Sequence, residues 1–306
     1  MNKPVSILIT WDIDPFPDVN IEAKKTALRQ TQQLLREQRI QSTFFLPAKM
    51  TEALGGEVQQ LLQDGHEIGC HGLTHGDEEN YDRMPEDLQQ RYLYESTHIL
   101  RQNTGEDISS FRGPRVKTSH VTQKILVDLG YNADCSVASQ RIDFVSSNLV
   151  NVHWIFAPRL PYRPSDRSAF RRGQQKIWVV PLSAVIVPFV SSVLYLLRTR
   201  FMKVLFRTLY AEARRTGKPI VYLVHPFEFA PSTLQYRPEN LSFLQEVRAH
   251  GFLVRERFYE KDHRQRFQMN QELLEYMRSF PNVEFQTVRG YVARALAGKQ
   301  QEPARA

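Results

Sequence analysis

The stretch that decides the fold is VSILITWDID, residues 5–14. Its apolar run from Val5 to Thr10 is typical of a buried strand in a parallel sheet. The run leads into Asp12 and Asp14, and the alternation of side chains along an extended chain sends both carboxylates the same way. Two like charges so close need a cation or a proton, although an Asp-x-Asp at a strand end can also be a turn or a helix cap.

Along the rest of the chain, short apolar runs alternate with amphipathic helical stretches, and this pattern favours βαβ units around a parallel sheet. The predicted strands are Val5–Thr10, Ser42–Leu46, Glu67–Cys70, Ser109–Arg112, Tyr131–Ser136, Ile177–Val180, Pro219–Val224, Phe252–Arg255 and Val283–Gln286. The predicted helices are one capped by Asn20, then Glu57–Gln63, Pro85–Gln102, Ser119–Leu129, Arg200–Thr216, Pro238–His250 and His263–Phe280. The rhythm predicts one barrel-like domain over residues 1–298, with an irregular insertion at about 139–200 and a disordered tail at 299–306.

The composition is that of an ordinary soluble globular protein. The chain has 306 residues, of which 42% are hydrophobic and 24% charged, and this excludes disorder, collagen and coiled coil. Two cysteines, Cys70 and Cys135, cannot form a disulfide framework, so a reducing cytosol suits the chain.

The positive charge is concentrated in one region. The net charge of the chain is +7. Twelve basic residues and two acidic ones lie between Arg159 and Arg215, so the net charge of the rest of the chain is −3. No aromatic residues interleave with these charges as in a nucleic-acid site, so a phosphate or an anionic membrane surface is the expected partner, with a solvated basic face as the alternative.

An uncharged stretch lies inside the same region. Ile177 to Leu197 is long enough to cross a bilayer, but Pro181, Pro188 and three serines interrupt it. We therefore expect a buried strand followed by an apolar loop or an interfacial segment rather than a spanning helix.

The residues that can carry chemistry follow predicted strands. In a parallel α/β architecture the carboxyl ends of the strands converge on one face. His71 and His75, four residues apart, follow the strand that ends at Cys70, and with Asp14 they offer a His, His, Asp set for one cation. Two further strands end in Arg112 and His225. The combination suits metal-activated water with Asp12 as a spare carboxylate.

Taken in order, these segments resemble the NodB-type polysaccharide deacetylases of carbohydrate esterase family 4. The first family motif, Thr-Phe-Asp-Asp, corresponds to Thr10 to Asp14, and its His-x-x-x-His corresponds to His71 and His75. The Arg-containing third motif corresponds to Arg112 to Pro114, and the late histidine to His225.

The sequence departs from this family pattern in several places. Ile13 separates the two aspartates, as in the variant Asp-x-Asp branch that includes intracellular amidohydrolases and capsule or glycolipid deacetylases. The residue after the first histidine is Gly72, and Arg115 replaces a tyrosine of the substrate wall. The fourth-motif carboxylate is Asp134 or, as the second choice, Asp143.

The resemblance implies an α/β fold, a distorted (β/α)7 barrel of the NodB-homology or glycoside hydrolase-deacetylase type. It also implies a divalent metal held by Asp14, His71 and His75, with Zn²⁺ expected and Co²⁺, Ni²⁺, Fe²⁺ or Mn²⁺ as alternatives.

The resemblance further implies catalytic roles for four residues. Asp12 would be the general base, Arg112 would hold it, His225 would be the general acid, and Asp134 would orient His225. The expected reaction removes an N-acyl group, with N-acetyl the first choice, from an amino sugar of a polysaccharide or a lipid-linked glycan.

Two alternatives stay open at this level, and one further expectation concerns location. The chain could hydrolyse a small cyclic or linear amide, as allantoinase-like and deformylase-like relatives do, or it could be an inactive glycan-binding module. Because Asp12 lies only twelve residues from the start, removal of a signal peptide would delete it, so a cytoplasmic enzyme peripheral to the inner membrane surface is expected. The sequence predicts no nucleic-acid partner and no particular oligomeric state.

Overall fold

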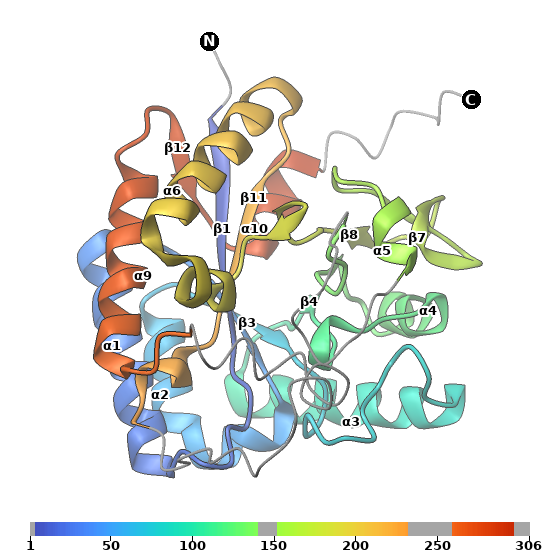
Figure 1. Cartoon of the computed structure of the whole chain (residues 1–306). Coiled ribbons are helices and arrows are strands. Elements are labelled where there is room, and N and C mark those ends of the chain that lie inside the picture. The colour runs from blue at the N-terminus through green and yellow to red at the C-terminus, as the bar shows by residue number, and fades with distance from the viewer. Residues whose placement is uncertain (1–3, 140–151, 232–258, 297–306) are drawn as a thin grey trace, which may run out of the picture.

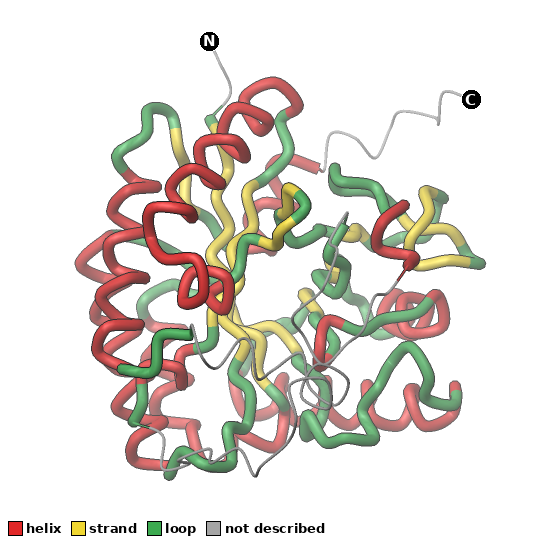
Figure 2. Tube along the Cα trace, in the orientation of Figure 1, coloured by secondary structure: helices red, strands yellow, loops and turns green. Residues whose placement is uncertain are grey.

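The core is a curled parallel sheet, as Figures 1 and 2 show. The computed structural model describes residues 4–139, 152–231 and 259–296. Seven strands follow one another in the order β11-β1-β2-β3-β4-β5-β8 and are parallel throughout. They are β1 (Val5–Asp12), β2 (Thr43–Leu46), β3 (Glu67–Cys70), β4 (Ser110–Phe111), β5 (Ala133–Asp134), β8 (Trp178–Val179) and β11 (Ile220–Val224). An eighth, β12 (Val283–Phe285), pairs with the start of β1. The predicted distorted (β/α) barrel is confirmed.

The helices lie outside this sheet (Figure 2). They are α1 (Ile21–Gln38), α2 (Thr51–Gln63), α3 (Glu86–Thr104), α4 (His120–Asp128), α5 (Val152–Phe156), α6 (Ser191–Thr216), α9 (His263–Arg278) and α10 (Val288–Tyr291). Local chemistry sets several of their ends: Asn20 caps α1 through its side chain, and Ser119 caps α4 in a reciprocal capping box. Helices α1, α2, α3, α4, α6 and α9 each return the chain to the start of the next strand of the sheet, so the strand ends that carry the candidate residues share one rim.

The uncharged stretch from Ile177 to Leu197 is divided among several elements. The strand predicted at its start is β8, and the chain then forms a short hairpin of β9 (Ala184–Val185) and β10 (Val187–Pro188). Helix α6 begins at Ser191, but the backbone of Arg198 (φ 69°) is not helical and divides it, so the part after the break begins close to the predicted Arg200. Among the residues described, none of the helices has both the length and the hydropathy to cross a bilayer.

The region predicted as an irregular insertion is regular in part. Besides β8 and α5 it holds an antiparallel hairpin of β6 (Pro164–Ser165) and β7 (Ser168–Arg172). The predicted helix Pro238–His250, the predicted strand Phe252–Arg255, Asp143 and the 299–306 tail lie outside the described residues.

The barrel closes between β8 and β11 through a loop rather than a ladder of paired strands. The Val221 amide donates to the Ser183 hydroxyl at 2.9 Å, and Val190 forms a single parallel bridge with Leu223. This seam contains few hydrogen bonds. Because Ser183 and Val221 are both buried, the loss of one of these bonds leaves a buried polar group unpaired and lowers stability.

We expect Ser183→Ala to lower the free energy of unfolding by about 1–3 kcal/mol, because it leaves the buried Val221 amide without this acceptor. Urea unfolding measures the change. Ser42→Ala is the matched control, since the Ser42 hydroxyl is equally buried but has no hydrogen-bond partner in the described structure, and we expect little loss there. Equal losses in the two variants would contradict the role of the seam.

Candidate active site

The end of β1 places Asp12 against a buried arginine. Asp12 is 3% exposed and Arg112 is fully buried, and the Arg112 Nη1 donates to the Asp12 Oδ1 at 2.6 Å. The same guanidinium donates from Nη1 to the Thr10 hydroxyl at 3.0 Å and from Nε to the Cys135 carbonyl at 3.1 Å. An ion pair this enclosed keeps the carboxylate charged and oriented.

Three other side chains converge beside Asp12. The Asp14 Oδ1 lies 3.2 Å from the His71 Nε2 and 3.3 Å from the His75 Nε2. Ligand atoms of the three residues all lie within 4.8 Å of one another. The two aspartates face the same way, since the His71 Nε2 is also 4.0 Å from the Asp12 Oδ2.

A hydrogen bond on its far side fixes the orientation of His71. Its Nδ1 lies 2.6 Å from the Arg112 carbonyl oxygen, which can only accept, so Nδ1 carries the proton and Nε2 has a free lone pair. An imidazole held in this way is the usual arrangement in metal sites. The ligand atoms of two imidazoles and one carboxylate therefore converge on one position, and this set fits a divalent cation such as Zn²⁺.

The loop between the two histidines depends on a residue that the sequence analysis did not select. Glu79 is fully buried, and its carboxylate accepts hydrogen bonds from the backbone amides of Leu73, Thr74 and His75 at 2.6–2.7 Å. The loop needs this support because Gly72 (φ 79°) and His75 (φ 64°) both adopt left-handed backbone conformations. Glu79 thus positions His75, and nothing in the polar run Asp77 to Glu79 distinguishes it beforehand.

His225 approaches the cluster from the opposite side. Its Nε2 lies 3.5 Å from the Asp14 Oδ2, and its Nδ1 lies 3.2 Å from the Glu228 Oε1. Glu228 is buried in the short turn η3 (Pro226–Phe229) and also accepts a hydrogen bond from the Tyr195 hydroxyl at 3.0 Å. The i, i+3 spacing within one turn brings His225 and Glu228 together.

These contacts raise the pKa of His225 and lower the pKa of Asp14. Burial disfavours the charged form of His225, but the carboxylates of Glu228 and Asp14 outweigh it and raise the pKa of His225 to about 9. Burial likewise disfavours ionised Asp14, yet His225 and His71 hold its pKa well below the usual range. A cation at Asp14 would offset that carboxylate and leave Glu228 as the main anion facing His225.

Asp134 does not lie next to His225. It is fully buried at the end of β5 and accepts from the Thr118 hydroxyl, the Gln123 side chain and the Ser136 amide, each at 2.9 Å. It therefore shapes the turn that presents the Cys135 carbonyl to Arg112, and Glu228 takes the position beside His225 that the sequence analysis expected for Asp134.

Arg115, which stands where the family has a tyrosine, reaches back over the histidine loop. Its guanidinium donates to the Gly76 carbonyl at 3.1 Å and to the Asp77 carboxylate at 3.0 Å. Its charge also contributes to lowering the pKa of His75, after burial and the neighbouring His71.

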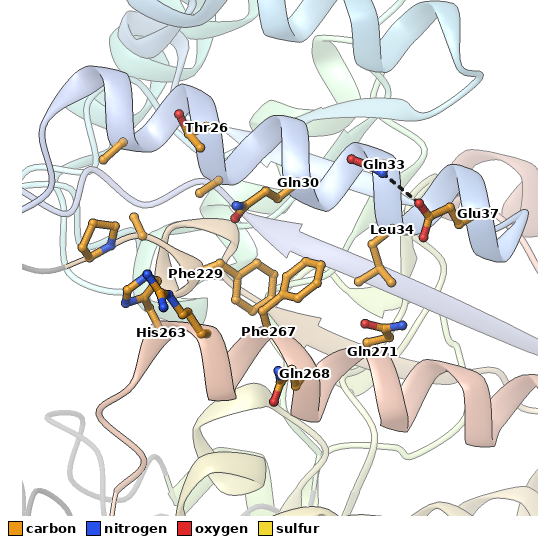
Figure 3. Close-up of a pocket in the computed structure, with 15 residues that line it drawn as sticks. Thr26, Gln30, Gln33, Leu34, Glu37, Phe229, His263, Phe267, Gln268 and Gln271 are labelled. Atoms are coloured by element: carbon orange, nitrogen blue, oxygen red, sulfur yellow. Dashed lines mark hydrogen bonds between the residues drawn. The ribbon is translucent and has the colours of Figure 1, made fainter.

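A separate groove of about 720 Å³ lies in the helical layer between α1 and α9 (Figure 3). Phe229 and Phe267 meet edge to face at its floor, with ring centres 5.3 Å apart, and glutamines from both helices line its sides. None of the candidate site residues lines it.

Comparison with known proteins agrees with the geometry. Residues 2–133, which include Asp12, Asp14, His71, His75 and Arg112, match the family model for polysaccharide deacetylase. Over these residues the chain is similar to the polysaccharide deacetylases. It is also 25% identical over 104 residues to a peptidoglycan deacetylase of Helicobacter pylori, and the match spans about a third of each protein, 34% in both cases.

Solved structures resemble this chain over nearly its whole length. One from Mycobacterium smegmatis, assigned to the polysaccharide deacetylases, has a TM-score of 0.64 at 15% identity and covers 100% of this chain and 95% of its own. The PuuE allantoinase has a TM-score of 0.57 at 14% identity, with coverages of 95% and 91%. At these identities the likeness shows the fold. Deacetylases of this family generally depend on a divalent metal, and the Asp14, His71 and His75 cluster is a site that could hold one.

We expect His75→Ala to weaken divalent-metal binding by more than about 100-fold, because it removes one of three candidate ligands. Metal content after dialysis and titration of the metal-free protein measure this. His98→Ala, on the exposed side of α3, is the control and should retain wild-type affinity. Unchanged binding in His75→Ala would exclude this cluster as the metal site.

We expect Glu228→Gln to reduce turnover about 10–100-fold with little change in metal affinity, because an amide cannot stabilise protonated His225. Asp134→Asn is the comparison: it should lower stability in urea unfolding more than it lowers turnover, since Asp134 bonds only to groups behind the site. The reverse ranking of the two turnovers would restore Asp134 as the partner of His225.

Proposed function

We propose that this chain is a metal-dependent amide hydrolase that removes an N-acyl group, N-acetyl in the simplest case, from an amino sugar of a polysaccharide or a lipid-linked glycan. The proposal rests on the convergence of the ligand atoms of Asp14, His71 and His75. Asp12 lies on one side of this cluster and His225 on the other. This arrangement offers a cation position, a base and an acid within one small volume.

When bound, a divalent ion would polarise the amide carbonyl and lower the pKa of water. Asp14, His71 and His75 would hold it, and the His71 tautomer fixed by the Arg112 carbonyl keeps the required lone pair free. The Glu79 carboxylate would keep the His75 backbone in its left-handed conformation and so keep the imidazole in place.

Asp12 is suited to take a proton from the attacking water. Its Oδ1 accepts from Arg112, so the guanidinium stabilises the ionised form, and its Oδ2 lies toward the candidate ligands at 4.0 Å from the His71 Nε2. A base that stays charged and oriented in a buried site needs such a partner.

His225 is suited to give a proton to the leaving amine. An amide nitrogen leaves poorly unless it is protonated, and Glu228 raises the pKa of His225 so that the imidazolium is the form present near neutral pH. The Tyr195 hydroxyl donates to the other oxygen of Glu228 and fixes the carboxylate in that position.

The substrate class rests on the family and on the named relatives. The Helicobacter pylori relative is a peptidoglycan deacetylase, which favours an N-acetylated glycan. A complete set of acid, base and candidate ligands argues for an active enzyme over a glycan-binding module. Assay of an N-acetylglucosamine oligomer against allantoin distinguishes the proposed class from a small-amide hydrolase, and turnover of allantoin alone would overturn the glycan proposal.

We expect Asp12→Asn to keep the bound metal and to lose about 10²–10⁴-fold in turnover, because an amide of the same shape cannot accept a proton. Release of acetate from the oligomer and metal analysis of the same sample give the two readouts. Asp128→Asn, an exposed carboxylate at the end of α4, should behave as wild type. Near-normal turnover of Asp12→Asn would mean that another group is the base.

A further inference from the structure

The outward side of α6 carries an apolar stripe that the fold does not use. Phe201 and Val204 follow at helical spacing after the break at Arg198 and are 37% and 60% exposed, and Leu197, just before that break, is 40% exposed. The opposite side of the same helix supplies the core with Met202, Phe206 and Leu209, all fully buried. Single exposed apolar residues are ordinary, but these three within eight residues of chain, called the apolar stripe below, mark a surface that meets something apolar.

A second apolar side chain is exposed on an element that contacts α6. The hairpin of β9 and β10 contacts α6, and Ile186 at its tip is 67% exposed in a left-handed backbone conformation (φ 65°). The turn therefore presents a large β-branched side chain to solvent at the cost of backbone strain, which folding alone does not require.

A row of arginines runs alongside the apolar stripe. Arg200, Arg207 and Arg214 repeat every seven residues and are exposed, as is Arg215 in the last turn. In the described part of the chain none of these four forms a salt bridge. Among the described residues, no acidic group pairs with the positive charge of this face.

The side of α6 that meets α9 is different. There Arg198 pairs with Glu260, and Lys203 pairs with Glu272 at 2.5 Å. The basic residues beside α9 and the segment before it are thus paired, whereas Arg200, Arg207 and Arg214 form no salt bridge with a described residue. This contrast points to an anionic partner outside the chain.

The face is tied to the candidate active site through the helix itself. Tyr195, two residues before Leu197, donates to Glu228, and Glu228 contacts His225. The first turns of α6, before the break at Arg198, therefore lie against the turn that follows β11 and supports His225.

We propose that the outward face of α6 docks on an anionic lipid bilayer. Leu197, Phe201 and Val204 would enter the boundary between headgroups and acyl chains, and Arg200, Arg207 and Arg214 would contact lipid phosphates while their aliphatic stems lie along the apolar stripe. An acidic protein partner would match the arginines but would leave the neighbouring apolar stripe less well accommodated. The proposal does not depend on which amide the chain hydrolyses.

Vesicle co-sedimentation tests the proposal with the full chain. Vesicles of equal parts phosphatidylglycerol and phosphatidylcholine should bind the wild-type protein at low salt, and raised salt should release most of it. Arg200→Ser combined with Arg207→Ser should lower the partition coefficient about thirtyfold, and Phe201→Ser combined with Val204→Ser should lower it more than about tenfold.

The matched controls lie on and near α3, on another part of the molecule. Arg83→Ser combined with Arg91→Ser removes the same charge, and Tyr94→Ser removes a side chain that is 66% exposed. Both should bind the vesicles as wild type does. Acetate release from a soluble oligomer should be unchanged in every variant, so a failure of the docking proposal is distinct from a failure of the proposed function.

Three results would overturn the proposal. They are no binding to the anionic vesicles at low salt, equal binding to vesicles of phosphatidylcholine alone, and equal losses in the α6 and α3 variants. Far-ultraviolet circular dichroism of each variant confirms that these exposed substitutions leave the fold intact.

Discussion

The buried guanidinium of Arg112 is the interaction on which the candidate site depends. It donates to Asp12 and Thr10 from β1 and to the Cys135 carbonyl after β5, and it lies 4.4 Å from the ring centre of Phe45 on β2. The Arg112 carbonyl accepts from His71, which follows β3. One residue after β4 thus connects the ends of four other strands, and a fully buried charge is tolerable only because these partners surround it.

Two charged neighbours of opposite sign act on the two sides of the candidate cation position. A cation, Arg112, faces Asp12 and favours its negative form, whereas an anion, Glu228, faces His225 and favours its positive form. Two groups that must begin a reaction in opposite charge states are therefore prepared by opposite neighbours. Neither neighbour is one of the three candidate ligands, so the charge of the base and of the acid can be set without changing the ligand set.

Helix α6 connects this chemistry with the surface. Its first turns supply Tyr195 to Glu228, and its inward side packs in the core. Its outward side carries the apolar stripe and arginines that form no salt bridge with a described residue. Enzymes that act on substrates anchored in a membrane need the reacting bond close to the bilayer surface, and a docking helix that also supports the acid would satisfy that need. A single element of secondary structure would then relate the position of the membrane to the position of the substrate.

The sequence by itself determined the elements and the candidate ligands, because both are local. The apolar run into Asp12 and Asp14, the i, i+4 spacing of His71 and His75, and the capping by Asn20 each depend on residues within one or two turns of chain. The order of the motifs along the chain was likewise enough to indicate the barrel.

Tertiary structure decided which partners those residues have. Glu79 beneath the histidine loop, Glu228 in place of Asp134 beside His225, and the outward stripe of α6 could not be selected from the sequence. An acidic side chain in a polar run looks the same whether it is solvated or buried, and an apolar residue in a helix looks the same whether it faces the core or the solvent. Only the packing of distant segments sets the burial and the charge around such groups, and those two quantities determine their chemistry.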